Sequence, residues 1–587
     1  MPHLTKQHHT VRDILFILIF CGFFFLLFLG SRPLSLPDEG RYPSIAWEML
    51  VDHQYVIPKL NGVPFLDKPI LYYWFEAASM KLFGVNAWAI RLPPALFGIF
   101  GCLMVYFVGL KLWNRRVGFI AALILATSPL YFFSAHYADM DLEVAVLVSA
   151  GFFCFLLAQH ADEYHHWTVR YLWMWLAFIF AGLACLTKGL IGIAFPMMVV
   201  ALGIALTHRW SIIKKLHLFT GVALFLAVTL PWYLMIQHRQ PNFFEYFFYY
   251  QQVSRYLADG NFNNVMPFWF YLAVLLGSLL PWSIATLPGI ARAKKLWQQR
   301  REHYALFFMV TWVVVIIVFF SIPRSKIVGY ILPVVPALSL MMALFVEREI
   351  TQPTKAGIIA LNVFSYVAIA LGVALLAIPY FDPKIPAHLV HYTFGTAAIV
   401  FIAGGVVILW ELRRQGMLRI FWTLIVMMTL FNLAALLAIP QVDQKTSLPL
   451  TNAVKPFMAP DTILVSYYDY YQDIPIYLQH KMMVVYDWNN TDTSHVDNWA
   501  RDFYYGIQEN PDTRQWMITE PEFFTLWNQH KQPVIVFASA GDYHFLNQQL
   551  SKPNSFIAYY RSVVAFTNQS IPEQPKPQEQ QIPIDSL

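Results

Sequence analysis

Two adjacent carboxylates follow the first apolar stretch of the chain, in the sequence Leu36-Pro37-Asp38-Glu39-Gly40-Arg41-Tyr42. A helix that begins at Asp38 would place Asp38 and Arg41 on one face. Acidic residues at a helix start also satisfy free backbone N–H groups, so a capping role alone is the simpler interpretation. The functional interpretation is a carboxylate and a guanidinium that meet a substrate at the membrane surface.

A second polar cluster lies downstream, within residues 61–74. Asn61-Gly62 marks a turn, and Asp67-Lys68-Pro69 brings one charge of each sign to the start of an aromatic helix. Helix N-termini and lysine side chains both bind phosphate. The alternative is a surface ion pair that contributes little to stability.

Charged residues also interrupt the later apolar stretches. Asp139 and Asp141 enter one of them, with Glu143 after them. Carboxylates at membrane depth usually face a cavity or a partner, although a position among the lipid headgroups would explain both. Lys188 separates two further stretches, and Arg324, Lys326 and Tyr330 precede another. For these cations the alternative is a side chain that extends from a helix end to the membrane surface.

Together these residues combine anionic and cationic groups beside a bilayer. The carboxylates are Asp38, Glu39, Asp67, Asp139 and Asp141, and the cations are Arg41, Lys68, Lys188, Arg324 and Lys326. Arg and Lys side chains hold a phosphate, while a carboxylate aligns an acceptor or stabilises an oxocarbenium-like centre. The combination suits a substrate that is both phosphorylated and lipid-linked.

The composition of the chain predicts that membrane helices hold these residues in place. Of the 587 residues, 58% are hydrophobic and 13% are charged, whereas soluble domains carry about 25% charged residues. This composition excludes a disordered or collagen-like chain and argues against a soluble enzyme. Apolar stretches long enough to span a bilayer predict about thirteen helices, near residues 14–30, 84–110, 117–135, 140–158, 171–187, 189–207, 216–236, 266–288, 304–321, 327–346, 356–378, 392–410 and 420–439.

The placement of Lys and Arg predicts the orientation and the domains. They cluster at the N-terminus and in every second loop, which should be cytoplasmic. An odd number of spans then places the C-terminal segment outside. We expect a mainly α-helical, polytopic transmembrane domain over 1–439 that includes the outer loop 31–83. An extracytoplasmic α/β domain over 440–568 should follow, with strands near 462–468, 482–486 and 533–538, and then a disordered tail over 569–587.

In order along the chain, these motifs resemble those of the GT-C membrane glycosyltransferases. The residues that carry the resemblance are Asp38-Glu39-Gly40-Arg41-Tyr42, Asn61-Gly62, Asp67-Lys68-Pro69 with Leu71-Tyr72-Tyr73-Trp74, Thr187-Lys188-Gly189, and Lys326 with Tyr330-Ile331-Leu332-Pro333. The chain looks most like the aminoarabinose transferases that modify lipid A, within the wider family related to protein O-mannosyltransferases. The resemblance covers the whole chain.

The resemblance implies transfer of a sugar, with inversion, from a polyprenyl-phosphate donor to lipid A or another envelope acceptor at the periplasmic face. The sugar of this branch is 4-amino-4-deoxy-L-arabinose. The resemblance implies that Asp38 and Glu39 are catalytic, and that Asp139, Asp141 and Lys188 support them. It assigns the donor phosphate to Arg41, Lys68, Lys326 and Tyr330.

The resemblance also implies a divalent metal ion as a cofactor. Its ligand would be the residue before the lysine, which is often Glu in the family and is Asp67 in this chain. The family tends to place a His before the eighth span, where this chain has Gln252. Glutamine is a poor replacement for imidazole at a soft metal site, so the sequence leaves the metal open.

A bacterial inner membrane location follows, with several membrane passes, a cytoplasmic N-terminus and a periplasmic C-terminal domain. The expected partners are the donor lipid, a lipid or protein acceptor and membrane lipids, with no nucleic acid. Three alternatives stay open: a transferase for protein or another glycolipid, a transporter or flippase for a lipid-linked sugar, and a non-catalytic scaffold. Transporters place charges near the bilayer midplane and often have repeated halves, and neither feature is evident in this sequence.

Overall fold

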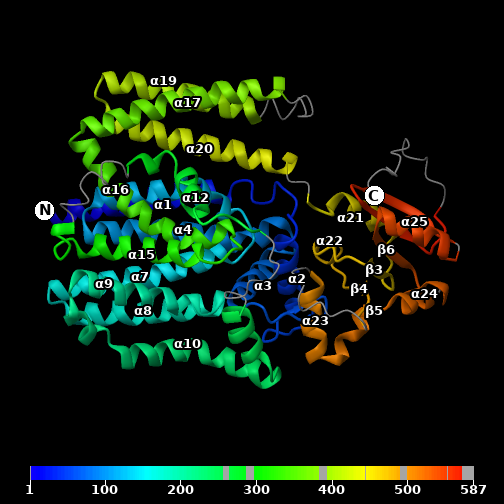
Figure 1. Ribbon diagram of the computed structural model, residues 1–587. Coiled ribbons are helices and arrows are strands. Elements are labelled where there is room, and N and C mark those ends of the chain that lie inside the picture. The colour runs from blue at the N-terminus through cyan, green and yellow to red at the C-terminus, as the bar shows by residue number, and fades with distance from the viewer. Residues whose placement is uncertain are drawn as a thin grey trace.

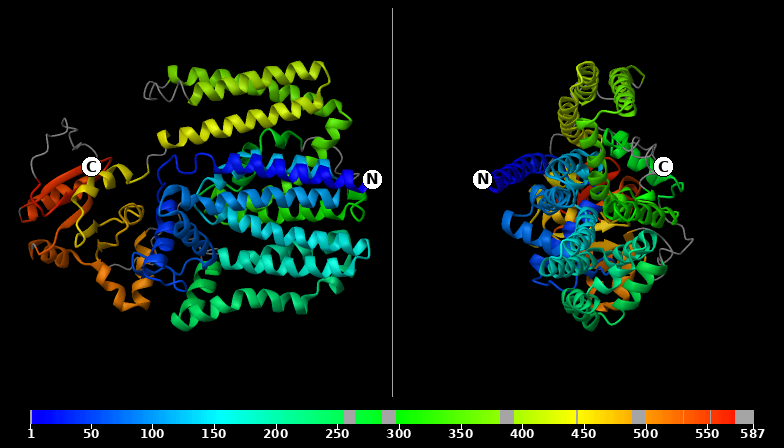
Figure 2. Two further views of the ribbon diagram at one scale, coloured as in Figure 1. Left: turned by 180° about the vertical axis from the view of Figure 1, so that it is seen from behind. Right: turned by 90° about the vertical axis from the view of Figure 1, so that its left-hand side faces the viewer.

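The computed structural model describes residues 2–254, 264–285, 297–381, 393–442, 445–488, 499–529, 531–551 and 553–571. Long helices form a bundle at one end of the molecule, and a smaller domain with a sheet lies at the other end (Figure 1). Two further views show the long helices running side by side along one axis (Figure 2). The molecule therefore has the membrane bundle and the C-terminal α/β domain that the sequence predicts.

Ten helices of the described residues are long and apolar enough to cross a membrane. They are α1 (Pro2–Leu26), α4 (Ala87–Leu112), α7 (Asp141–Glu163), α8 (Trp167–Lys188), α10 (Leu218–Arg239), α15 (Tyr304–Ser321), η4 with α16 (Val328–Val334 and Val335–Thr351), α17 (Lys355–Phe381), α19 (Gly395–Arg413) and α20 (Met417–Val442). The pair α5 (Arg115–Thr127) and α6 (Pro129–Ala135) forms an eleventh candidate, bent by 66°. Ser128 adopts an extended backbone at the bend, as expected of a residue that precedes proline.

The two remaining predicted spans also have helical counterparts. Residues 189–207 form the shorter apolar helix α9 (Ile191–Thr207). The span predicted at 266–288 contains α12 (Phe270–Ser278) and the 3₁₀ helix η3 (Trp282–Ala285), and its last residues lie outside the described part of the chain. The 3₁₀ helix η1 (Trp210–Lys215) and the π-helix η2 (Glu245–Ser254) lie in the connections on either side of α10.

The basic loops meet at the end of the bundle that carries the N-terminus (Figure 1). Arg115 pairs with Asp13 of α1 at 2.5 Å, and Arg209 pairs with Glu163 at 2.9 Å. These ion pairs connect loops that the sequence predicts to be cytoplasmic. The carboxylates of the first outer loop lie at the opposite end.

The outer loop between α1 and α4 is ordered by two short helices and a hairpin. Its elements are α2 (Asp38–Val51), β1 (Lys59–Leu60), β2 (Val63–Pro64) and α3 (Leu71–Phe83). Leu60 pairs with Val63 across the predicted Asn61-Gly62 turn. Asn61 and Gly62 have φ values of 52° and 81°, the left-handed backbone that a two-residue hairpin turn needs.

A six-stranded sheet organises the C-terminal domain, in the order β5-β4-β3-β6-β8-β7. The strands are β3 (Ile463–Tyr467), β4 (Met482–Val485), β5 (Met517–Ile518), β6 (Val534–Ser539), β7 (Ser555–Tyr560) and β8 (Val563–Thr567). The first four strands in this order are parallel, and β8 and β7 are antiparallel additions. The predicted strands β3, β4 and β6 are confirmed, whereas the other three were not predicted. Described residues end at 571, so the rest of the predicted tail lies outside them.

Helices cover both faces of this sheet. The helices of this domain are α21 (Leu448–Val454), η6 (Lys455–Phe457), α22 (Ile474–Leu478), α23 (Trp499–Glu509), η7 (Pro511–Trp516), α24 (Glu520–Gln529) and α25 (Ala540–Gln549), of which α23 packs against β2 of the outer loop. Alternate residues of β6 enter different cores, because side chains alternate along a strand. Val536 packs with residues of α24 and α25, whereas Ile535 packs with residues of α21 and α22.

The C-terminal domain is joined to the outer loop by hydrogen bonds and close packing. Asn61 donates to the carbonyl of Met482 at 2.6 Å and accepts from its N–H at 2.8 Å. The N–H of Leu34 donates to the Tyr477 hydroxyl at 2.7 Å. A Cβ on Gly40 would lie 2.8 Å from the backbone nitrogen of Asp473, so α2 and this domain touch where only glycine fits.

Candidate active site

Asp38 and Arg41 occupy the first turn of α2 at the outer end of the bundle. Arg41 Nη2 lies 2.8 Å from Asp38 Oδ1, and the two side chains are 21% and 34% exposed. The Arg41 guanidinium lies 5.0 Å from the ring centre of Tyr42 and 5.8 Å from that of Phe65. The predicted pairing on one helix face is therefore present, and both charges remain accessible to a ligand.

Glu39 has a different environment from its neighbour. It is fully buried, and its carboxylate accepts hydrogen bonds from Arg32 at 2.5 and 2.8 Å and from Arg91 at 2.7 and 2.8 Å. The backbone N–H groups of Ser35 and Ala138 donate to it as well. Burial alone would raise the pKa of Glu39, but the two guanidinium groups outweigh burial and lower the pKa to about 2. A carboxylate enclosed in this way has no surface for a substrate, so its geometry favours a positioning role over a catalytic one.

Asp141, Lys188 and Tyr330 form a third part of the site. Lys188 at the end of α8 makes an ion pair with Asp141 at the start of α7. The Lys188 ammonium also lies 4.6 Å from the centre of the Tyr330 ring. A Cβ on Gly329 would collide with the Asp141 carboxylate, so η4 packs directly against this pair. Three helices distant in sequence thus converge here.

Asp139 links this group to α2. Its Oδ1 accepts a hydrogen bond from the backbone N–H of Asp141 at 2.8 Å. Burial raises the pKa of Asp139 well above its usual value, and the negative charges of Asp141 and Asp38 raise it further. The environment therefore favours the protonated form of Asp139.

Tyr42, in the first part of α2, has a buried hydroxyl that is affected by these carboxylates. Burial raises its pKa well above the usual value, and the charge of Arg41 opposes that rise. The charges of Asp38, Asp139 and Asp141 each add to it. These four side chains are therefore within electrostatic reach of Tyr42, and the hydrogen bond from the Ala138 N–H to Glu39 joins the two segments that carry them.

Asp67 and Lys68 lie in the bend between β2 and α3. Asp67 is buried and accepts hydrogen bonds from the Tyr246 hydroxyl and from Gln251 of η2. Arg41 and Asp67 both shift the pKa of the buried Tyr73, which rises well above its usual value mainly through burial. The Arg41 guanidinium lies 5.8 Å from the ring centre of Phe65, two residues before Asp67, so this bend borders the Arg41 side of the site. Lys68 beside it is half-buried.

The Lys326 ammonium is bound to backbone carbonyl oxygens in this structure. Lys326 is buried, and its ammonium donates to the carbonyl oxygens of Met266 at 3.1 Å and Pro323 at 2.5 Å. These bonds hold the strand-like contact between residues 264–266 and 324–326. The expected phosphate role of Lys326 therefore rests on the resemblance alone.

The sequence did not single out several residues that shape the site. Arg91 is fully buried at the start of α4, and Arg32 is buried before α2. An arginine inside a predicted membrane span needs an anionic partner, and that signal could have pointed to Arg91. Gln251 faces Asp67, whereas Gln252, the residue expected there, lies beside Gly189.

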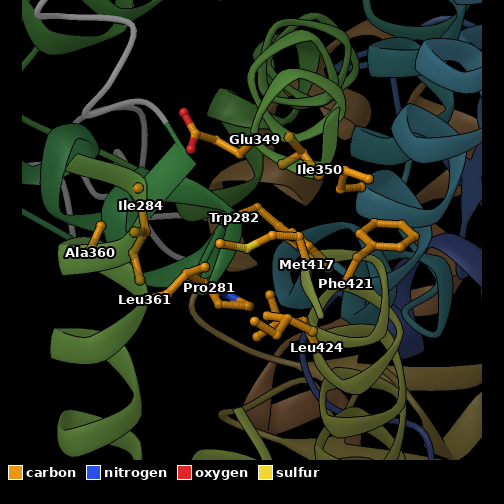
Figure 3. A pocket seen from close by; sticks show the side chains of 13 residues that line it. Pro281, Trp282, Ile284, Glu349, Ile350, Ala360, Leu361, Met417, Phe421 and Leu424 are labelled. Atoms are coloured by element: carbon orange, nitrogen blue, oxygen red, sulfur yellow. The ribbon is translucent and has the colours of Figure 1, made fainter. Parts of the chain in front are cut away.

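Two of the described cavities have an almost entirely apolar lining. One pocket lies between η3, α16, α17 and α20 and is apolar except for Glu349 (Figure 3). A larger cavity of about 690 Å³ shares Pro281 and Ile284 with it and is lined by apolar residues of α17 and α20. Such linings suit hydrocarbon rather than phosphate. Two other cavities carry charged side chains, and they lie beside the basic loops predicted to be cytoplasmic.

Comparisons with known proteins agree with this geometry. The family model for dolichyl-phosphate-mannose-protein mannosyltransferase matches residues 37–247. The undecaprenyl phosphate-alpha-4-amino-4-deoxy-L-arabinose arabinosyl transferase of Yersinia enterocolitica is 33% identical over 66% of this chain and 70% of that protein. The Serratia proteamaculans protein of the same name is 34% identical over 56% of this chain and 58% of its own length.

A solved structure extends the likeness to nearly the whole chain. ArnT from Cupriavidus metallidurans, crystallised with undecaprenyl phosphate, superposes with a TM-score of 0.82 at 27% identity, over 95% of this chain and 98% of that one. The expected GT-C fold is thereby confirmed. The chain belongs to the family of undecaprenyl phosphate-4-amino-4-deoxy-L-arabinose arabinosyl transferases and is a multi-pass membrane glycosyltransferase of the inner membrane.

Proposed function

We propose that this protein transfers 4-amino-4-deoxy-L-arabinose from undecaprenyl phosphate to lipid A at the periplasmic face of the inner membrane. The names of the relatives state both the sugar and the donor, and the related crystal structure contains undecaprenyl phosphate. The observation that carries the proposal is the accessible pair of Asp38 and Arg41 at the outer rim, where the N–H of Ala138, the neighbour of Asp139, donates to Glu39.

The orientation of the site follows from the basic loops. Lys and Arg gather at the end of the bundle that holds the N-terminus, which the positive-inside rule assigns to the cytoplasm. Helix α2, which begins at Asp38, lies at the opposite end, beside the C-terminal domain (Figure 1). The site and that domain therefore face the periplasm, where lipid A is accessible before its export.

The donor phosphate is the leaving group of the reaction. Its negative charge is already spread over several oxygens, so departure needs nearby cations rather than a general acid. Arg41 and Lys68 are two cations of this region with partly exposed side chains. They bind the phosphate, while Lys188 holds Asp141 through their ion pair.

Asp38 acts on the acceptor side of the transfer. A lipid A phosphate is already ionised and needs no strong base, so with this acceptor Asp38 positions the sugar or the phosphate. With a hydroxyl acceptor, Asp38 would be the general base. In both cases the acceptor attacks the anomeric carbon on the face opposite the leaving phosphate, and this single displacement inverts the configuration.

The choice of acceptor is tested with purified protein in detergent. The donor is undecaprenyl phosphate that carries radiolabelled aminoarabinose, and the acceptors are lipid A, a second envelope glycolipid and a Ser- and Thr-containing peptide. Label should appear in lipid A alone. Label in the peptide or the other glycolipid would contradict the acceptor assignment. Movement of intact donor across a vesicle, without cleavage, would favour a flippase.

A further inference from the structure

The carboxylate of Asp67 is held by two hydrogen-bond donors from a distant segment. Asp67 is 6% exposed. The Tyr246 hydroxyl and the Gln251 side-chain amide both donate to its Oδ1, the amide at 2.8 Å. The same amide nitrogen lies 2.7 Å from the Tyr246 oxygen. Asp67, Tyr246 and Gln251 therefore form a closed triangle of hydrogen bonds next to Lys68.

The backbone of η2 explains why these two side chains act together. Residues 245–254 form a π-helix, in which residues five apart lie on the same face. Tyr246 and Gln251 are five apart, so both reach the same carboxylate. In an α-helix residues three and four apart share a face, so residue 251 would turn away from the face that carries Tyr246. This register also leaves Gln252 beside Gly189.

The resemblance to the family places a divalent cation beside this carboxylate, and the residues present do not fit one. Zinc in proteins takes three or four Cys, His or carboxylate ligands. Among the described residues, no group of three or more His, Cys, Asp or Glu side chains could hold a metal ion. The phenol and the amide present hydrogen atoms to Asp67, where a cation would need their lone pairs.

We propose that this transferase orders the bend around Lys68 without a metal ion, with Tyr246 and Gln251 as the positioning residues that hold Asp67. The proposal deepens the proposed function and rests on it. Asp67 directly precedes Lys68, so a fixed Asp67 limits the directions that Lys68 can take toward the donor phosphate. The charge of that phosphate is then met by Arg41 and Lys68 and not by a cation at Asp67.

The first experiment measures metal binding directly. The full chain is purified, treated with EDTA and then titrated with Zn²⁺ or Mg²⁺, while metal content and the unfolding temperature are recorded. We expect no stoichiometric metal before treatment and no rise in the unfolding temperature on addition of either ion. A stoichiometric metal, or stabilisation by one of these ions, would overturn the proposal. Neither readout requires transfer, so both decide the question even if the proposed function fails.

The second experiment compares the effects of replacing Gln251 and Gln252 on the KM for the donor. Gln251→Ala removes a hydrogen bond to a carboxylate and should raise the KM for the donor about tenfold, with a smaller effect on kcat. Tyr246→Phe, which keeps the ring, should act in the same direction. Gln252→Ala is the matched control and should leave the KM unchanged. Equal KM values for Gln251→Ala and Gln252→Ala, or rescue of Gln251→Ala by Zn²⁺, would refute the positioning role.

Discussion

Asp38 and Glu39 are adjacent in the chain, yet their carboxylates lie in opposite environments. Asp38 is 34% exposed and shares one ion pair with Arg41, whereas Glu39 is fully buried between Arg32 and Arg91. Asp38 is therefore accessible to a substrate, whereas Glu39 fixes the start of the helix that carries Asp38.

Replacement of Glu39 should destabilise the protein. Glu39→Gln leaves two buried guanidinium groups without their anion, and loss of one partner of a buried ion pair costs about 3–5 kcal/mol. Thermal unfolding in detergent measures the loss. Asp52→Asn, at the end of the same helix, breaks an exposed contact with Lys481 and should cost about 1 kcal/mol or less. Equal unfolding temperatures for the two variants would contradict the positioning role of Glu39.

Ionisation of Glu48, a buried residue of the outer loop, should make the stability of the protein depend on pH. Burial raises its pKa to about 7, although Lys481 and the N–H groups of Gly62 and Asn61 oppose that rise. The unfolded chain has the usual value of 4.5, so the folded state binds more protons between these two values. Stability should therefore fall as the pH rises from about 4.5 to about 7, by about 3 kcal/mol in total, and then stay level.

Unfolding temperatures recorded across that pH range test the effect of Glu48. Glu48→Gln cannot ionise and should flatten the slope in this window. A slope of the same size in wild type and in Glu48→Gln would assign the pH dependence to other groups.

Replacement of Gly40 tests whether the contact between α2 and the C-terminal domain contributes to stability and transfer. In Gly40→Ala the new Cβ would lie 2.8 Å from backbone atoms of Gln472 and Asp473. Such overpacking costs about 1–3 kcal/mol, and it should lower transfer because α2 carries Asp38. Gly22→Ala in α1 is the control, since nothing lies within 4 Å of its Cβ. Wild-type stability and transfer in Gly40→Ala would show that the contact is dispensable.

Lys68 should contribute to binding of the donor phosphate. Lys68→Met keeps the length of the side chain and removes the charge, and a charge-assisted hydrogen bond is worth about tenfold in affinity. Binding of undecaprenyl phosphate to the purified protein measures the loss. Lys59→Met on the adjacent hairpin serves as the control and should bind normally. The same affinity in both variants would remove Lys68 from the phosphate site.

The membrane fold could be predicted from the sequence because span length and basic loops are local properties. Among the described residues, ten predicted spans are helices long enough to cross a membrane, and Pro129 divides another into α5 and α6. The described parts of the spans predicted at 189–207 and 266–288 contain only shorter helices. The hairpin at Asn61-Gly62 was also predictable, since two-residue turns require a left-handed backbone at both positions.

The partners of the site residues could not be predicted in the same way. Arg91 reaches Glu39 across 52 positions in the sequence, and Gln251 reaches Asp67 across 184. These contacts depend on how the helices pack, which no local pattern encodes. The choice of Gln251 over Gln252 depends in addition on the π-helical register of η2. Charge types were therefore predictable, and their pairings were not.

The central claim is that Asp38 serves the transfer itself. The most direct test is the transfer rate of Asp38→Asn with saturating donor and lipid A, measured together with donor binding and the unfolding temperature. The account predicts a rate at least about a hundredfold lower, with binding and stability close to those of wild type. Turnover at the wild-type rate in this variant would contradict it.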